Sequence, residues 1–390
     1  MKILFVLAQA FDPNAGGVQR TTFKLGKHFT ENGIEVAYFS FSKENQVLPE
    51  YGSLFHAKLS RGASEIANQK LFIQTLHNFK PDFVINQVPY EKIIRTILSE
   101  QKASVGYVLL GCLRNSLFSF KSNVADILMQ QFPSVLHPVV KLKAIQKIAL
   151  ENHRKKHKAE LLDIINKHDK FILLTPRNRD ELEYFLGQNY PHDKVISIPN
   201  SIPFIDYEAE DKEKILLHVG RLNIPQKRSD LLMKVWEQCY EQLPDWKFYV
   251  IGDGPYMDTL KKDIENKKLP RVVLEGFQKP ESYYKKSSIF MMPSAYEGFP
   301  NTILEAQSYG CVPFAFDSYA SLGWIVNDGV DAVLTQPYNT EEMAQAIVDL
   351  ASSTEKMHDM QRKALMNVEK FTIDEVGKQW FKLFDESSNK

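Results

Sequence analysis

Short apolar runs alternate with longer segments in which apolar and polar residues recur at helical spacing. Residues 16–33 show this helical pattern, and Gly33 closes the segment. Before position 199 the apolar runs are residues 2–8, 34–41, 82–87, 104–110 and 170–174. Strands alternating with helices are typical of parallel sheets covered by helices on both faces. We therefore predict an α/β fold for this part of the chain.

The alternation stops at Pro199–Pro203 and then begins again. After the break the apolar runs are residues 214–220, 246–252, 271–276, 288–292 and 311–316. A chain of 390 residues also exceeds what one hydrophobic core usually holds. The sequence thus predicts two Rossmann-like domains, residues 1–198 and 199–370, followed by a C-terminal helical segment, 371–390.

The apolar runs and the cysteines do not indicate a secreted or membrane-spanning protein. The first apolar run is short for the apolar region of a signal peptide, so we interpret it as a buried strand. No run approaches the roughly 18 consecutive apolar residues that a membrane span requires. Cys112, Cys239 and Cys311 lie far apart, which argues against a disulfide framework or zinc site and fits a reducing cytoplasm.

Charge is unevenly distributed although the formal net charge is zero. Residues 1–200 hold 26 Lys and Arg against 18 Asp and Glu, and the remainder holds 22 against 30. This asymmetry predicts an anionic partner or surface for the first half, the alternative being chance distribution over two domains. Within it, Val139–Lys158 has seven basic residues and one acid, Glu151. Such a segment is typical of a helix on an anionic membrane surface, and a solvated helix explains it equally well. No nucleic-acid partner is predicted.

Loops after the predicted strands carry the candidate chemistry, because ligands bind at the carboxyl ends of parallel strands. Gly16 and Gly17 follow the first strand, where glycine lets a ligand approach the backbone and a helix N-terminus attracts anions. A flexible turn is the alternative. The chain has no Gly-x-Gly-x-x-Gly fingerprint, which weakens a dehydrogenase interpretation.

Two cations follow the first strand of the second domain. Arg221 offers a planar fork of donors suited to phosphate, and Lys227 offers a point charge. We interpret them as a diphosphate clamp, although solvated surface residues would look the same. His218, within an apolar strand, is interpreted as a core histidine. The turn Gly252–Pro255 is assigned a structural role.

The segment from Pro293 to Glu305, PSAYEGFPNTILE, joins an apolar strand to a helix. Pro300 suits the first turn of that helix, since it has no N–H to leave unpaired. The N–H groups of Asn301 and Thr302 would then face a ligand. Glu297 and Glu305 are acceptor-only groups suited to hydroxyls. A ligand that carries both phosphates and sugars would use all of these groups.

Together these motifs resemble glycosyltransferase family 4, whose members are retaining, nucleotide-sugar-dependent enzymes with the two-Rossmann fold called GT-B. The resemblance is strongest across residues 195–350. It implies a first domain (1–198) that binds the acceptor, a second (199–370) that binds the donor across a cleft, and a last helix (371–390) that crosses back to the first domain.

The resemblance also implies roles for individual residues. Glu305 would hold the ribose hydroxyls and Glu297 the hydroxyls of the donor sugar. Arg221 and Lys227 would neutralise the leaving nucleoside diphosphate, where charge develops. Glu297, Arg221 and Lys227 form the implied catalytic set. The implied donor-binding residues are Gly16, Gly17, Arg221, Lys227, Glu297, Gly298, Phe299, Pro300, Asn301, Thr302 and Glu305.

The implied reaction moves a hexosyl or N-acetylhexosaminyl group from a nucleotide sugar, UDP-linked, to a glycan or lipid-linked saccharide in surface polysaccharide or glycoconjugate biosynthesis. No metal and no cofactor are expected, and the expected location is the cytoplasm, with a peripheral position on the inner face of the membrane. Two alternatives stay open: a nucleotide-sugar epimerase or hydrolase of the same fold, and a non-catalytic nucleotide-sugar-binding protein.

The sequence departs from the family pattern at two positions. The spacing from Arg221 to Lys227 is one residue longer than the commonest form, which leaves open whether Lys227 or Arg228 reaches phosphate. Many relatives also carry a histidine that contacts the donor sugar, where this chain has Arg114. Either Arg114 makes different sugar contacts or the correspondence is shifted.

Overall fold

The computed structural model describes residues 1–13, 16–203, 205, 207 and 212–388, and it divides the chain into two compact units. Unit 1 comprises residues 1–115, 151–203 and 371–390, and unit 2 comprises 116–150 and 204–370. Positions 389 and 390 of the predicted C-terminal segment lie outside the described residues.

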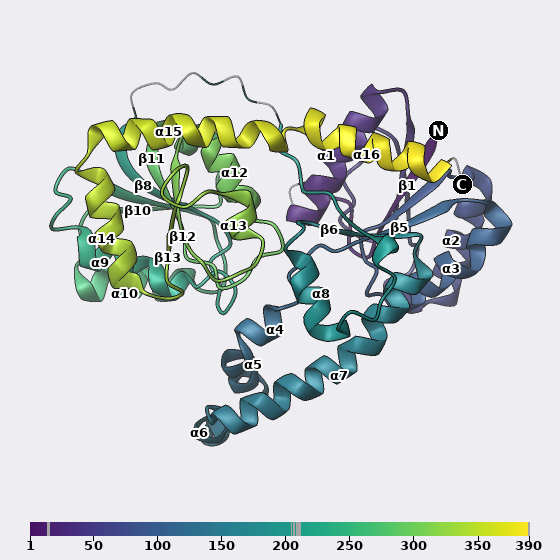
Figure 1. Cartoon of the computed structure of the whole chain (residues 1–390), viewed down its shortest axis with the longest axis horizontal. Coiled ribbons are helices and arrows are strands. Elements are labelled where there is room, and N and C mark those ends of the chain that lie inside the picture. The colour runs from purple at the N-terminus through teal and green to yellow at the C-terminus, as the bar shows by residue number, and fades with distance from the viewer. Residues whose placement is uncertain (14–15, 204, 206, 208–211, 389–390) are drawn as a thin grey trace. The chain divides into compact units, whose positions relative to one another are not determined.

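Unit 1 contains a parallel sheet with strand order β3-β2-β1-β4-β5-β6-β7 (Figure 1). Its strands are β1 (Lys2–Leu7), β2 (Glu35–Ser40), β3 (Ser53–His56), β4 (Phe83–Asn86), β5 (Val108–Cys112), β6 (Lys170–Leu173) and β7 (Val195–Ser197). Its helices are α1 (Gly17–Glu31), α2 (Ile66–Phe79), α3 (Lys92–Val105), α8 (Asn178–Leu186), α16 (Ile373–Ser388) and most of α7 (Lys143–Lys167).

Helices cover both faces of this sheet, as the alternation along β1 requires. Ile3 and Phe5 belong to a buried cluster shared with α1 and α16, whereas Leu4 and Val6 belong to one shared with α2 and α3. In the first cluster, the ring centroid of Phe29 in α1 lies 5.4 Å from that of Phe384 in α16. The last helix therefore packs within unit 1.

Unit 2 contains a second parallel sheet with strand order β10-β9-β8-β11-β12-β13. Its strands are β8 (Glu213–Val219), β9 (Lys247–Ile251), β10 (Val272–Gly276), β11 (Ser287–Met292), β12 (Val312–Phe316) and β13 (Val333–Thr335). Its helices are α4 (Ser119–Ser122), α5 (Val124–Gln131), α6 (His137–Val140), α9 (Leu232–Cys239), α10 (Met257–Lys267), α11 (Glu281–Lys286), α12 (Asn301–Gln307), α13 (Leu322–Ile325), α14 (Thr340–Ala351) and α15 (Thr354–Val368).

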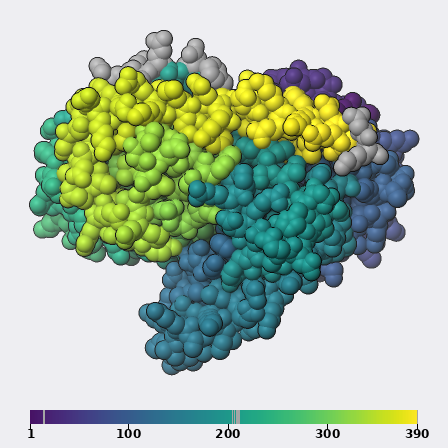
Figure 2. Space-filling view, in the orientation of Figure 1, coloured from purple at the N-terminus to yellow at the C-terminus, as the bar shows by residue number. Residues whose placement is uncertain are grey.

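The core of unit 2 follows the same logic. Ile289 and Met291 of β11 share a buried cluster with Trp236 of α9 and Ile347 of α14. Phe290, which points to the other face, is equally buried, and α12 contacts β11. Figure 2 shows the residues of α15, in yellow, on the visible surface of this unit.

The two parallel sheets confirm the predicted α/β class, and each apolar run that we interpreted as a strand overlaps one. One boundary was wrong: residues 104 and 105 end α3, because Gly106 at φ +88° closes that helix before β5 begins at Val108. Sequence analysis missed β3, β7 and β13, which have only three or four residues, and β3 is mostly exposed.

The unit boundaries differ from the predicted domains in one segment. Residues 116–150 were assigned to the first domain but belong to unit 2. They form no strand of the first sheet. Val124, Leu128 and Val140 form a small cluster of their own, and α5 lies against residues 224–230. Unit 2 otherwise begins at residue 204 rather than 199. Among the described residues, no helix has the length and apolarity needed to cross a bilayer.

Candidate active site

The central loops of unit 2 leave the sheet where its strand order reverses. β8 is the first strand of this unit in the sequence, and its neighbours in the sheet are β9 and β11. In such sheets the chain turns in opposite directions from the two central strands, which opens a ligand-binding crevice at their carboxyl ends. The loop after β8 carries Arg221 and Lys227, and the loop after β11 carries Glu297. The topology therefore brings these predicted residues to one edge of one sheet.

Lys227 and Glu297 form an ion pair at this edge. The Lys227 Nζ lies 2.6 Å from the Glu297 Oε1, and the side chains are only 18% and 10% exposed. Such a pair loses most of its hydration, so it is weak evidence for a stabilising role. A carboxylate that accepts hydroxyls beside a cation that attracts phosphate is chemically suited to a ligand carrying both groups.

Neighbouring amides hold the two loops together. The backbone N–H of Ala295 donates to the carbonyl of Gln226 at 2.7 Å, which joins the loop after β11 to the loop after β8. The Gln226 Nε2 lies 3.5 Å from the Glu297 Oε2, and the Asn223 Oδ1 accepts from the Lys227 N–H at 3.2 Å. Sequence analysis missed Asn223 and Gln226. Their position between the two predicted cations was the available signal.

Arg228 has a different partner. Its guanidinium donates to both carboxylate oxygens of Asp230, at 2.9 and 2.8 Å, and lies over the ring of Tyr338 at 4.6 Å. The hydrogen bonds to Asp230 raise the pKa of Arg228. Of the two basic residues that the sequence left open, Lys227 is thus the one paired with Glu297.

The turn after β9 packs against the backbone of the loop that carries Arg221. Gly252 and Gly254 adopt φ values of +141° and +154°. A Cβ atom at position 252 would lie 1.8 Å from the Gly220 carbonyl oxygen, and one at 254 would lie 2.4 Å from the Leu222 oxygen. This turn therefore requires glycine for close backbone approach. The exposed Arg221 side chain itself makes no hydrogen bond or ion pair with the described residues.

The helix after β11 begins one residue later than predicted. Pro300 is the N-cap residue and α12 starts at Asn301. The Asn301 N–H does not face outward freely, because it donates to the Phe299 carbonyl at 2.9 Å. Glu305 lies in the second turn of α12, with its Oε2 3.5 Å from the hydroxyl oxygen of Tyr284.

Buried and half-buried side chains lie near the Lys227–Glu297 pair. Burial and the charge of Glu297 raise the pKa of Tyr296 and of Tyr319. His218 is fully buried in β8, and its Nδ1 lies 3.0 Å from the Met291 carbonyl oxygen. Burial lowers the pKa of His218 to about 4, so the ring is neutral at pH 7. This agrees with the interpretation of His218 as a core residue.

In unit 1 the corresponding switch point lies between β1 and β4. Gly16 and Gly17 stand at the start of α1, after β1. Arg114, after β5, donates from Nε to the Gln87 Oε1 and from Nη1 to the Asn200 Oδ1, the latter at 3.1 Å. Its Nη2 is buried without a partner among the described residues. Sequence analysis missed Gln87, although it directly follows β4.

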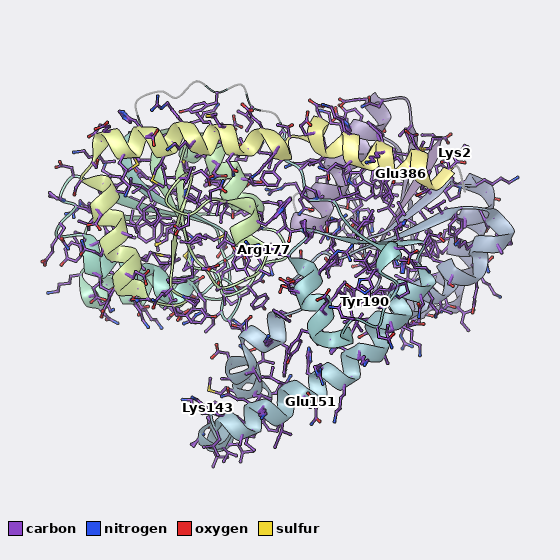
Figure 3. All side chains as sticks on the ribbon, viewed as in Figure 1. Lys2, Lys143, Glu151, Arg177, Tyr190 and Glu386 are labelled. Carbon is purple, nitrogen blue, oxygen red and sulfur yellow. The ribbon has the colours of Figure 1, made fainter. Side chains whose placement is uncertain are left out.

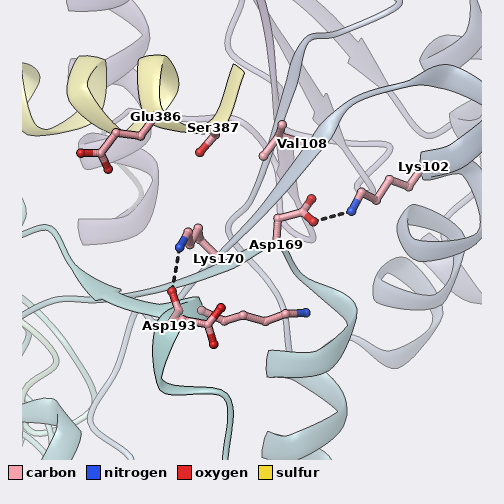
Figure 4. A pocket seen from close by; sticks show the side chains of 8 residues that line it. Lys102, Val108, Asp169, Lys170, Asp193, Glu386 and Ser387 are labelled. Carbon is pink, nitrogen blue, oxygen red and sulfur yellow. Dashed lines mark hydrogen bonds and ion pairs between the residues drawn. The ribbon is translucent and has the colours of Figure 1, made fainter. Parts of the chain in front are cut away.

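Unit 1 also has a hollow of about 620 Å³ at the opposite edge of its sheet, where β5 and β6 begin (Figure 4). Its lysines are already bound. Lys102 pairs with Asp169, Lys170 donates to the Asp193 carbonyl at 2.7 Å, and Lys194 donates to two carbonyls near the end of α7. We therefore assign this hollow a structural role. Among the described residues, no group of three or more potential metal ligands was found.

Comparison with known proteins places this geometry in context. Residues 204–365 match the family model described as Glycosyl transferases group 1, a stretch that includes Arg221, Lys227, Glu297 and Glu305. A crystal structure of Anabaena Alr3699/HepE in complex with UDP and glucose superposes with a TM-score of 0.74 at 17% identity, covering 99% of this chain and 100% of that one. The fold is GT-B.

Curated relatives of this GT-B chain include glycosyltransferases. The amylovoran biosynthesis glycosyltransferase AmsD of Erwinia amylovora is 24% identical over 374 residues, which cover 94% of this chain and 95% of AmsD. An uncharacterised glycosyltransferase of Haemophilus influenzae is 30% identical over 222 residues, 54% of this chain and 60% of that protein. Across three curated relatives, the chain spans only 23%, 60% and 47% of the relative's own length.

Proposed function

We propose that this protein is a retaining glycosyltransferase that moves a hexosyl or N-acetylhexosaminyl group from a UDP-sugar to a glycan or lipid-linked saccharide. The observation that carries the proposal is the Lys227–Glu297 pair at the switch point of unit 2. The pair combines the two chemistries that a nucleotide sugar needs, a cation for phosphate and a carboxylate for hydroxyls.

The predicted residues of unit 2 have the following roles in this proposal. Arg221 and Lys227 bind the diphosphate, Glu297 accepts from hydroxyls of the donor sugar, and Glu305 accepts from the ribose. The backbone from Gly298 to Thr302 lies beside the diphosphate. Because Arg221 is exposed and has no partner among the described residues, it is free to follow the leaving group.

The proposed chemistry needs no covalent intermediate on the protein. The bond between the anomeric carbon and the phosphate oxygen breaks, and the electron pair leaves with UDP. The acceptor hydroxyl then forms its bond to the same face of the oxocarbenium-like sugar, and its proton passes to the departing phosphate oxygen. Charge develops on that phosphate during the reaction, so the cations that face it lower the barrier.

Metal independence is part of the proposal. Arg221 and Lys227 supply positive charge at the place where a divalent ion would otherwise act. We expect that saturating EDTA leaves the rate of UDP release unchanged. A rate that falls with EDTA and returns with Mg²⁺ would contradict this point.

A donor assay with a matched pair of variants tests the function. Purified protein is incubated with UDP-glucose, UDP-galactose and UDP-N-acetylglucosamine, with and without a lipid-linked saccharide, and released UDP is measured. We expect acceptor-stimulated release that Glu297→Gln abolishes. Glu265→Gln, at an exposed position of α10, should leave the release unchanged. Release from none of the donors would count against the proposal.

The same assay separates the two alternatives. An epimerase or hydrolase of this fold would convert or cleave the donor at full rate without acceptor. A non-catalytic binding protein would bind UDP-sugars and release no UDP. The similarity to a glycosyltransferase of amylovoran biosynthesis over 94% of the chain favours transfer in surface polysaccharide biosynthesis. In this scheme unit 1 contributes to acceptor binding, and unit 2 binds the donor.

We also propose that Val139–Lys158 lies on an anionic membrane surface, which would place the enzyme peripherally on the inner face. The segment comprises the end of α6 and the first part of α7, where Figure 3 labels Lys143 and Glu151. Leu142 and Ile148 are 56% and 58% exposed beside the basic residues. Exposed apolar groups next to cations favour an anionic bilayer.

Vesicle flotation tests this location. We expect binding to phosphatidylglycerol vesicles that is lost when Lys155, Lys156 and Lys158 are replaced by glutamate. Absence of binding by the unaltered protein would end the membrane proposal without affecting the donor site.

A further inference from the structure

A hollow of about 330 Å³ adjoins the loop that carries Lys227. One wall comes from α5, with Asp126, Met129 and Gln130, and from the start of α6, with His137. The other wall comes from the loop itself, with Ile224 and Pro225 on one side of Lys227 and Arg228 and Asp230 on the other. All of these residues belong to unit 2. The hollow therefore lies next to the proposed donor site, on the same loop.

Two polar groups on the α5 wall make no hydrogen bond with the described residues, although the Asp126 carboxylate lies close enough to Arg228 to act on its charge. Within the part of the chain that the structure describes, neither the Asp126 carboxylate nor the Gln130 amide has a hydrogen-bond partner. Both residues are accessible, Asp126 partly and Gln130 fully. A carboxylate accepts from hydroxyls, whereas an amide both donates and accepts. These groups thus offer what a sugar hydroxyl needs.

The rest of the lining is apolar or already paired. Met129, Ile224 and Pro225 present apolar surface, which suits the C–H face of a sugar ring. Arg228 donates two hydrogen bonds to Asp230 and lies over Tyr338, so its charge is balanced by the Asp230 carboxylate. His137 also lines the hollow, and its Nε2 lies 2.9 Å from the Met129 carbonyl oxygen and 3.2 Å from that of Phe132. The two carboxylates, Asp126 and Asp230, outnumber the one arginine, which disfavours a phosphate group in the hollow.

We infer that this hollow is the subsite for a neutral or amino saccharide ring of the acceptor, rather than for a phosphate-bearing unit. The inference rests on the proposed function and adds a substrate class to it. It also gives a reason for residues 116–150 to lie in unit 2: this segment supplies the acceptor wall beside the loop that carries Lys227.

The NMR signal of the Met129 methyl group can show directly whether a sugar binds in the hollow. Protein labelled with ¹³C at its methionine methyl groups is titrated with methyl glycosides of glucose, galactose and N-acetylglucosamine, and separately with glycerol phosphate. Met129→Leu, a volume-conserving change, identifies the signal. We expect a saturable shift of the Met129 signal with at least one neutral sugar and none with glycerol phosphate. A shift with glycerol phosphate alone, or with none of the compounds, would overturn the inference.

Adjacent glutamines provide a matched kinetic pair. Gln130→Trp fills the hollow, whereas Gln131→Trp places the same side chain on α5 at a position that does not line it. We expect Gln130→Trp to abolish the Met129 shift and raise the acceptor KM at least tenfold with an unchanged donor KM. Asp126→Asn keeps an acceptor oxygen but removes its charge, so it should raise the acceptor KM about tenfold, as the loss of charge assistance to a hydrogen bond predicts. Gln131→Trp should change neither constant.

Failure of this inference is distinguishable from failure of the proposed function. If Gln130→Trp and Gln131→Trp change the acceptor KM equally while UDP release is intact, the acceptor subsite would be contradicted and the transferase function would stand. If the unaltered protein releases no UDP but shows a saturable Met129 shift, the saccharide site would be supported and the proposed reaction would be contradicted. A donor KM that rises in parallel with the acceptor KM would assign the hollow to the donor instead.

Discussion

The two sheets of this protein have the same strand order, apart from the additional edge strand β7 in unit 1, but different chemistry at their carboxyl edges. In both, the first strand of the unit lies between the second and a later strand, which puts a switch point at β1/β4 and at β8/β11. At the second point Lys227 meets Glu297 at 2.6 Å. Near the first, Arg114 is held by the neutral amides of Gln87 and Asn200. The fold therefore fixes where a ligand binds, and the loop residues decide which ligand.

Hydrogen bonds between loops hold the edge of unit 2 in place. In unit 2, the loop after β8 is bonded to the loop after β11 through Gln226 and is supported by the turn at Gly252. Groups held in this way need little reorganisation during a reaction, which is the basis of electrostatic catalysis. We accordingly expect substitutions at the edge of unit 2 to affect turnover more than substitutions at Arg114.

The largest effect should follow from breaking the ion pair. Lys227→Met leaves the 90% buried Glu297 carboxylate without its cation and removes a donor to the diphosphate. Turnover should fall by about 10³-fold, and the protein should also lose stability, because an unpaired buried charge is costly.

The double variant Lys227→Met/Glu297→Gln sharpens this test. Urea denaturation should show that it regains stability, since no unpaired charge remains, whereas UDP release should show that it stays inactive. A double variant that recovers activity would remove the pair from the mechanism.

Gly252→Ala should have the next largest effect. The added methyl group would meet the Gly220 oxygen at 1.8 Å in a backbone conformation that L-residues rarely adopt. We expect a loss of about 3 kcal/mol in the free energy of unfolding. Gly329→Ala is the matched control, because its φ is also positive at +68° but nothing lies within 4 Å. It should lose only about 1 kcal/mol, and equal losses would contradict the close-approach argument.

Removing the exposed cation should separate turnover from binding. Arg221→Ala should lower kcat by about 10²-fold, because its partner charge develops as the bond to UDP breaks. The donor KM should change far less. Steady-state kinetics with varied UDP-sugar measure both constants, and an unchanged kcat would exclude Arg221 from the mechanism.

Each unit also contains a buried neutral histidine, which predicts a common pH dependence. Burial lowers the pKa of His168 in unit 1 and of His218 in unit 2 from 6.5 to about 4. The unfolded chain therefore binds more protons between these values, and stability falls as the pH drops from 6.5 towards 4. Each histidine should contribute about 1.4 kcal/mol per pH unit. Urea denaturation at pH 7 and pH 5 should show a smaller difference for His218→Gln than for the unaltered protein.

The smallest effect is expected in unit 1. Arg114→Lys removes the planar fork that binds Gln87 and Asn200 together. We expect about a tenfold loss in kcat/KM, on the order of one charge-assisted hydrogen bond. Steady-state kinetics measure it, and a loss as large as that of Lys227→Met would invalidate the contrast between the two edges.

Much of the fold was predictable because buried parallel strands are nearly continuous apolar runs. This pattern predicted β1 and β11, but it did not predict the edge strand β3, which is mostly exposed and has only four residues. The position of residues 116–150 was not predictable either. Their three-residue cluster, Val124, Leu128 and Val140, is too small to create a distinctive periodicity.

The charged residues of the site were predictable and their partners were not. Lys227 and Glu297 stand 70 residues apart, and each follows a recognisable strand. Their direct contact depends on β8 and β11 being neighbours, which is a property of the sheet order. The bond between Gln226 and Ala295 runs between backbone groups, and backbone groups leave no trace in side-chain patterns. The contacts of Arg114 with Gln87 and Asn200 were not predictable either, because they also depend on which strands are neighbours in the sheet.

A structure of the protein with bound UDP tests the central claim most directly. We predict that the diphosphate lies against Lys227 and Arg221, with the ribose hydroxyls on Glu305, at the carboxyl edge of the second sheet. UDP bound elsewhere, for example in the hollow of unit 1 near Lys102 and Lys170 (Figure 4), would contradict the account.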